Sequence, residues 1–101
     1  MSNQIVAVGE EDFTLGFELV GLNAHRAAEL EELLKRKDIG IIILSQEEYD
    51  NQSSRVQQKI DTSIKPIVVL LSQEDVKGGH LREAVIRALG VDVLAQQEKK
   101  K

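Results

Sequence analysis

Residues 39 to 44 read Ile39-Gly40-Ile41-Ile42-Ile43-Leu44, an almost unbroken apolar run. Two similar runs flank it along the chain, Ile5-Val6-Ala7-Val8 before it and Pro66-Ile67-Val68-Val69-Leu70-Leu71 after it. Strands that are uniformly apolar, rather than alternating, are typical of a parallel sheet covered on both faces. Pro66 fits only at the first residue of its strand, because it lacks the N–H that a position inside the ladder needs. The three runs therefore predict a parallel sheet.

Helical patterns lie between and after these runs. Apolar residues recur at helical spacing in Arg26–Lys37, Gln46–Ser63 and His80–Leu89, and Gly90 follows the last of these as a stop signal. Strands that alternate with helices build βαβ units with right-handed crossovers. The predicted fold is α/β, with a small three- or four-stranded parallel sheet flanked by helices in a receiver-like or Rossmann-like arrangement. A C-terminal amphipathic helix completes it.

The path between the first two strands has two interpretations. Phe13–Gly21 has the spacing of a short helix weakened by two glycines, and its apolar residues for burial are Phe13, Leu15, Phe17 and Val20. Leu22–His25 is short and poor in β-forming residues. Either it forms a stub strand, or helix runs almost continuously from residue 14 to residue 37. The number of strands is accordingly three or four.

Composition limits the classes of function. The 101 residues suffice for one modest core, and 42% of them are hydrophobic and 30% charged. Cysteine is absent, which excludes disulfides, thiolate metal sites and cysteine nucleophiles. The aromatic residues are only Phe13, Phe17 and Tyr49, too few for the stacking platforms that bind single-stranded nucleic acid.

The net charge of −4 is unevenly distributed. Residues 1–50 hold 4 basic and 11 acidic side chains, whereas residues 51–101 hold 9 basic and 6 acidic ones. Such an acidic first half argues against nucleic acid as a partner, because binding to its backbone needs a basic surface. The longest apolar run is far shorter than the roughly 20 residues that cross a bilayer. No signal peptide precedes the first strand, so we expect a cytoplasmic protein without direct membrane insertion.

An acidic cluster follows the first strand, in Gly9-Glu10-Glu11-Asp12. Carboxylates at this position hold Mg²⁺ in phosphoacceptor receiver domains, but the aspartate and lysine that such domains carry after later strands are missing here. The other interpretation, which we favour, is that Glu11 or Asp12 caps the following helix. Gly78-Gly79 could likewise expose amides to an anion, but such a pair is more often a hinge.

Other reaction chemistry has no signature in the sequence. His25 and His80 are too far apart in sequence to form a histidine pair at metal-binding spacing. Dinucleotide and phosphate-loop motifs and a nucleophile elbow are also absent. The sequence therefore predicts a protein that is not an enzyme in itself, with no catalytic residue, metal site or cofactor.

The last helix, Leu81–Leu89, has two interpretations. It could simply cover its own sheet, as terminal amphipathic helices usually do. It could also dock on a partner helix, because Ile86 lies off the main apolar stripe and Arg82, Glu83 and Arg87 are placed for salt bridges at the contact edges. From the residues alone, both interpretations stay open.

Several segments resemble a known family, in order along the chain. They are Ile5-Val6-Ala7-Val8-Gly9-Glu10-Glu11-Asp12, Leu15-Gly16-Phe17-Glu18-Leu19-Val20-Gly21, Asp38-Ile39-Gly40-Ile41-Ile42-Ile43-Leu44, Lys65-Pro66-Ile67-Val68-Val69-Leu70, and the closing stretch from Leu81-Arg82-Glu83 to Arg87-Ala88-Leu89-Gly90-Val91-Asp92-Val93. This set resembles the F subunit of the archaeal (A-type) and vacuolar-type ATP synthases. One departure is that only Leu22 to Asp38 stands where the family has a further strand and a full helix.

The resemblance implies a non-catalytic subunit of the rotating central stalk. Such a subunit couples ATP synthesis or hydrolysis to rotation and ion translocation, and its C-terminal helix can regulate ATPase activity. The implied partners are the coiled-coil D subunit of the stalk and the catalytic A and B subunits, in a complex whose soluble part is peripheral to the membrane. The alternative, from another class, is a degenerate receiver-like signalling or nucleotide-binding domain.

The resemblance also places the expected partner interface on the last helix. Its buried contacts would be Leu81, Val85, Ile86 and Leu89, with Arg82 and Arg87 as ion pairs at the edge. We accordingly divide the chain into an α/β globular domain, residues 1–77, and a second part, residues 78–101, that comprises a hinge, the amphipathic helix and a polar tail.

Overall fold

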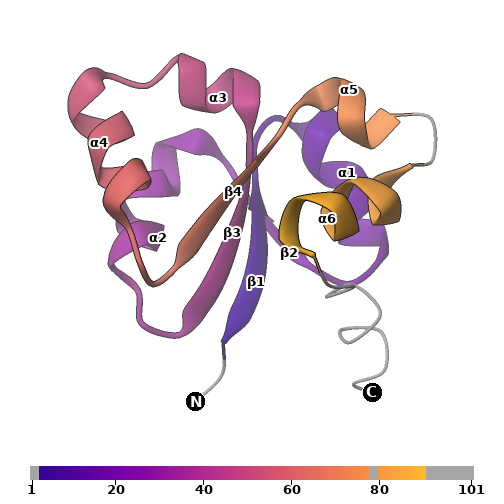
Figure 1. Ribbon diagram of the computed structural model, residues 1–101, viewed down its shortest axis with the longest axis horizontal. Coiled ribbons are helices and arrows are strands. Elements are labelled where there is room, and N and C mark those ends of the chain that lie inside the picture. Colours follow the sequence, from indigo (N-terminus) through magenta and orange to yellow (C-terminus); the bar gives the residue numbers. More distant parts are fainter. Residues whose placement is uncertain (1–2, 78–79, 91–101) are drawn as a thin grey trace.

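The computed structural model describes residues 3–77 and 80–90, apart from the side chain of Leu89. Within them, four parallel strands form one sheet in the order β2-β1-β3-β4 (Figure 1). The strands are β1 (Gln4–Val8), β2 (Asn23–His25), β3 (Ile39–Ser45) and β4 (Ile67–Leu71). The three predicted apolar runs are thus strands, and Pro66 directly precedes β4. The predicted α/β fold is confirmed.

The short strand β2 settles the path that the sequence left open. Gly21 has φ of +100°, a conformation that glycine adopts without a Cβ penalty, and it turns the chain back toward the sheet. Asn23, Ala24 and His25 then pair with Val6, Ala7 and Val8 of β1. The stub strand is therefore correct, and a continuous helix from residue 14 to 37 is wrong.

Helices cover both faces of the sheet (Figure 1). On one face lie α1 (Glu11–Leu19), α5 (Gln73–Val76) and α6 (Leu81–Leu89). On the other lie α2 (Leu30–Lys35), α3 (Gln46–Asp50) and α4 (Ser54–Thr62), with a 3-10 turn, η1 (Ala27–Glu29), before α2. α5 was not predicted, and α6 ends at Gly90 as predicted, with φ of +82°.

Two helix predictions were too long. The pattern over Gln46–Ser63 is divided between α3 and α4, because the Ser53 hydroxyl accepts a hydrogen bond from Val56 N–H (3.3 Å) and so begins a new helix. The pattern over Arg26–Lys37 contains η1 and the shorter α2, which ends at Lys35. Arg36 has extended backbone dihedrals and leads the chain into β3.

The core has one cluster on each face of the sheet. Around α1, α5 and α6 the buried residues are Ala7, Phe13, Phe17, Leu22, Ile43, Leu71, Ala84 and Val85. Around α2, α3 and α4 they are Val6, Val8, Leu30, Leu33, Ile39, Ile42, Leu44, Val56 and Ile60. The central strands β1 and β3 supply residues to both clusters, which is why their sequences are apolar at nearly every position.

Candidate functional site

The first candidate site is the crevice at the carboxyl ends of β1 and β3, where the strand order reverses and where open α/β sheets commonly bind ligands. A Cβ atom on Gly9 would lie 2.8 Å from Cδ2 of Phe13 and 3.1 Å from Cβ of Ser45. The hydroxyl of Ser45 accepts a hydrogen bond from Glu48 N–H and donates one to Glu47 Oε1, both at 3.1 Å. The chain's own side chains thus fill the space beside Gly9.

Arg26 bridges the carboxyl ends of the paired strands β1 and β2. Its Nη1 donates to the carbonyl oxygens of Gly9 (3.2 Å) and His25 (3.4 Å) and to Oγ1 of the buried Thr14 (3.2 Å). One guanidinium therefore joins the ends of two strands to α1. Sequence reasoning placed Arg26 on a helix and missed this role; the signal it offered was an arginine directly after the stub strand.

The acidic cluster does not cap α1 as predicted. The N-cap residue is Glu10, and its side chain makes no capping hydrogen bond, so the prediction that Glu11 or Asp12 caps the helix is wrong. Both lie in the first turn of α1, where their negative charges interact favourably with the positive end of the helix dipole. Among residues 3–77 and 80–90, no three His, Cys, Asp or Glu side chains are grouped so as to hold a metal ion.

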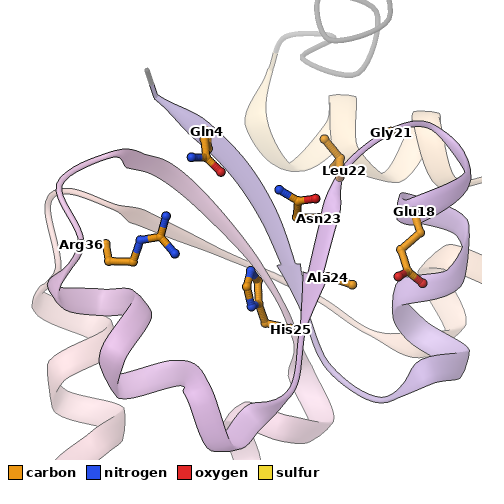
Figure 2. Close-up of a pocket in the computed structure, with 8 residues that line it drawn as sticks. All are labelled: Gln4, Glu18, Gly21, Leu22, Asn23, Ala24, His25 and Arg36. Atoms are coloured by element: carbon orange, nitrogen blue, oxygen red, sulfur yellow. The ribbon is translucent and has the colours of Figure 1, made fainter. Parts of the chain in front are cut away.

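A hollow of about 690 Å³ lies beside the edge strand β2 (Figure 2). Gln4 and Arg36 stand on one side of β2 and Glu18 of α1 on the other. The rest of its lining is Gly21, Leu22, Asn23, Ala24 and His25. The hollow is broad and open, a shape that suits contact with another surface better than enclosure of a small molecule.

Two of the titratable side chains around this hollow, Arg36 and His25, have partners within the chain, whereas Glu18 forms no ion pair with another described residue. Arg36 donates from Nε to Oδ1 of Asp38 (2.9 Å) and from Nη2 to Oδ2 (2.6 Å), and this guanidinium holds the pKa of Asp38 below its usual value. Nδ1 of His25 lies 2.7 Å from Oε1 of Glu29. That hydrogen bond, aided by the backbone N–H of Arg26, lowers the pKa of Glu29. These pairs fix side chains rather than prepare a proton donor or acceptor for a reaction.

The structure places the six residues of the expected partner interface in different environments. Val85 is only 1% exposed and belongs to the core cluster under α6, while Leu81 is half-buried against that cluster. Ile86 is half-buried, and Arg82 and Arg87 are exposed. The side chain of Leu89 lies outside the described residues, as do Gly78, Gly79 and residues 91–101, where the predicted hinge and polar tail fall.

A second exposed feature was missed by sequence reasoning. Leu15 and Leu19 on α1 are 53% and 78% exposed, although the pattern had offered Leu15 for burial. Their one-turn spacing was visible in the sequence, but nothing there told which side of α1 would meet the sheet.

None of the helices in the described part of the chain is long and apolar enough to span a membrane.

Comparison with known proteins points to one family. The profile of the ATP synthase (F/14-kDa) subunit matches residues 5–89. The F subunit of the A-type ATP synthase of Haloferax volcanii is 32% identical over 93% of this chain and 98% of its own length. The corresponding protein of Haloquadratum walsbyi is 31% identical over 97% of this chain and 99% of its own length.

A solved structure supports the same relationship. The crystal structure of the F subunit of the V-type ATP synthase from Archaeoglobus fulgidus superposes with a TM-score of 0.64 and 29% sequence identity. The match covers 71% of this chain and all of that one. These similarities agree with the resemblance noted in the sequence and favour it over a receiver-like domain.

Proposed function

We propose a structural role in a rotary ATP synthase for this chain, which belongs to the family of the ATP synthase (F/14-kDa) subunit and is an F subunit of the A/V type. The observation that carries the proposal is the similarity to A-type F subunits along nearly the whole chain. In this role the chain is a non-catalytic part of the rotating central stalk. It couples ATP synthesis or hydrolysis in the catalytic head to rotation and ion translocation.

The proposed partners are the coiled-coil D subunit of the stalk and the catalytic A and B subunits. Contact with them would place the chain on the cytoplasmic side, peripheral to the membrane. The described site chemistry supports a role in binding, because the crevice beside Gly9 is filled and Arg36 and His25 beside the β2 hollow are engaged within the chain.

We further propose that α6 is a partner-binding element. With α6 on its own sheet, the outward residues Arg82, Ile86 and Arg87 meet the partner, while Leu81 and Val85 hold the helix in place. Regulation of ATPase activity then follows if α6 leaves the sheet about a hinge at residues 78–79, as the division into residues 1–77 and 78–101 predicts. Contacts of the released helix with the partner, through Leu81, Val85 and Leu89, must then offset the apolar burial that Leu81 and Val85 lose, about 1.5–3 kcal/mol for a fully buried side chain.

Reconstitution of the synthase tests the central role. A complex assembled without this chain is expected to hydrolyse ATP with reduced coupling to ion pumping, and added chain should restore the coupling. The measurements are ATPase activity and ion uptake in vesicles that contain the complex. Equal coupling with and without the chain would rule out the role.

A binding experiment tests the α6 interface. Arg82→Glu, Ile86→Asp and Arg87→Glu are expected to weaken binding to the D subunit by about tenfold or more, which corresponds to about 1.4 kcal/mol. Arg55→Glu is the matched control, because Arg55 is an exposed arginine on α4 at the opposite face of the sheet. Unchanged affinity for all three α6 variants would contradict the interface. Val85→Asp is unsuitable, since it would bury a charge in the core.

A further inference from the structure

The surface of α1 away from the sheet carries an unusual pair of leucines. Phe13, Thr14 and Phe17 bury the inner side of the helix, whereas Leu15 and Leu19, four residues apart, share its outer side. Residues at this spacing are neighbours on a helix and form a ridge that packs into the groove of another helix. Single exposed leucines are ordinary on protein surfaces, but a ridge of two that nothing in the described part of the chain covers is a candidate contact.

Carboxylates border this ridge on both sides. At 100° per residue, Glu11 and Glu18 fall on one side of the two leucines and Asp12 on the other. All three are exposed, α1 contains no basic residue, and none of the three forms an ion pair with another described residue. The helix thus presents an apolar ridge bordered by carboxylates that form no ion pair with another described residue.

The helix beneath the ridge is firmly held. The rings of Phe13 and Phe17 lie with their centroids 5.3 Å apart in the core, and the Thr14 hydroxyl accepts a hydrogen bond from Arg26. A ridge on such a fixed helix needs little ordering before it binds, which favours affinity.

From these observations we propose that Leu15, Leu19, Glu11, Asp12 and Glu18 form a docking ridge for an amphipathic helix whose apolar seam is bordered by lysine or arginine. The apolar residues of that helix pack against the two leucines, and its basic residues pair with the carboxylates, as charged residues do at the edges of coiled-coil seams. The inference rests on the proposed function, in which the helical partner is the coiled-coil D subunit.

The rest of the surface offers a matched control. Ile64 and Ile67 are also exposed, at 84% and 53%, but they lie before and at the start of β4 rather than on a helix. They therefore share the apolar exposure of the leucine pair without its helical spacing or its carboxylate border. A contact specific to the docking ridge depends on the leucines and not on the isoleucines.

The experiment measures binding of the full chain to the purified D subunit of the same synthase. Leu15→Ala/Leu19→Ala is expected to weaken binding by at least about tenfold, while Ile64→Ala/Ile67→Ala leaves it unchanged. Thermal unfolding of each variant confirms that the leucine changes leave the fold intact, as their exposure predicts. Glu11→Gln/Asp12→Asn/Glu18→Gln should weaken binding and reduce its dependence on salt concentration.

Each other outcome overturns the inference. If the leucine variant binds as tightly as the unchanged chain, the ridge is not the contact, although the proposed function stands. If leucine and isoleucine variants weaken binding equally, exposed apolar surface in general is responsible. If the unchanged chain does not bind the D subunit, both the inference and the proposed partnership are wrong.

Discussion

The helices on the two faces of the sheet differ in how their ends and outer surfaces are satisfied. On one face, α3 and α4 each begin with a serine whose hydroxyl caps the helix, Ser45 and Ser53. Glu31 of α2 pairs with Arg55 (3.1 Å) and Lys59 (3.3 Å) of α4 and so joins two helices. On the other face, α5 is capped by Ser72, but α1 and α6 begin without a side-chain cap, as α2 does, and α1 exposes its leucine ridge.

The two faces of the sheet are therefore expected to differ in whether they remain exposed to water or bind a partner. The face of α2, α3 and α4 has serine caps on two of its helices and ion pairs that join α2 to α4, and it is suited to remain in water. The face of α1, α5 and α6 has an equally apolar core but leaves apolar residues and carboxylates outward. Stability is therefore expected to depend on both faces, and binding on one of them.

The largest expected effects on the free energy of unfolding come from truncating one fully buried side chain on each face. Phe17→Ala under α1 is expected to destabilise the chain by about 3–5 kcal/mol, and Leu30→Ala under α2 by about 2–5 kcal/mol, because both remove fully buried side chains. Unfolding in urea measures both free energies. A small effect for Phe17→Ala alone would mean that the face of α1 and α6 adds little to the stability of the isolated chain.

The sequence predicted the features that hydrophobic pattern and glycine conformation determine locally. The strands β1, β3 and β4 were visible because buried parallel strands are apolar at consecutive positions, as Ile41, Ile42, Ile43 and Leu44 of β3 show. The end of α6 at Gly90 was visible because few other residues adopt its positive φ.

The sequence did not decide features that depend on contacts between distant residues, and it left β2 as one of two alternatives. β2 is a strand because β1 lies beside it, not because Asn23, Ala24 and His25 favour strands. The orientation of α1, which leaves Leu15 exposed, follows from the packing of Phe13 and Phe17. The guanidinium bonds of Arg26 join atoms as far as 17 residues apart. Local patterns carry no information on such contacts.

Two glycines allow the packing to be compared at two places. Gly9 lies beside Phe13 and Ser45, and Gly16 lies on α1 beside Leu81 of α6. Gly9→Ala is expected to destabilise by about 1–3 kcal/mol, because its Cβ would lie 2.8 Å from the packed ring of Phe13. Gly16→Ala is expected to stabilise by about 0.5–1 kcal/mol, since alanine favours the helix and its Cβ would meet Leu81 Cδ2 at an ordinary 3.4 Å. Thermal unfolding measures both changes. A destabilised Gly16→Ala would show that α6 packs against α1 more tightly than the 3.4 Å separation from Leu81 indicates.

Removal of the serine cap of α4 is expected to have a smaller effect on stability. Ser53→Ala removes the oxygen that accepts from Val56 N–H and should cost about 1 kcal/mol. Because α6 has no such cap, amide hydrogens in α6 are expected to exchange faster than those in the unmodified α4. Ser54→Ala, one residue further on, serves as the control for Ser53→Ala. Slower exchange in α6 than in α4 would contradict the difference between the faces.

The smallest expected effect is the contribution of Glu31 to the pH dependence of stability. Hydrogen bonding to Lys59, together with the nearby charge of Arg55, lowers the pKa of Glu31 from its usual 4.5. A carboxyl whose pKa is lower in the folded state stabilises the fold above the unfolded pKa, and that contribution is lost as pH falls through the folded pKa. Glu31→Gln is therefore expected to destabilise slightly at pH 7 and to make stability less sensitive to pH below 4.5. Both Glu31 and its partners are exposed, so solvent screens the effect and added salt should reduce it further.

Thermal unfolding between about pH 7 and about pH 3, a range that spans the ordinary carboxyl pKa values, measures this profile. Glu18→Gln on α1 is the matched control, because Glu18 is an exposed glutamate that forms no ion pair with another described residue. A profile for Glu31→Gln that matches the unchanged chain would mean that α2 and α4 are held together by their buried residues alone. The face of α2, α3 and α4 would then differ from the face of α1 and α6 in the serine caps of α3 and α4 and in its apolar exposure, and the ion pairs of Glu31 would add nothing measurable.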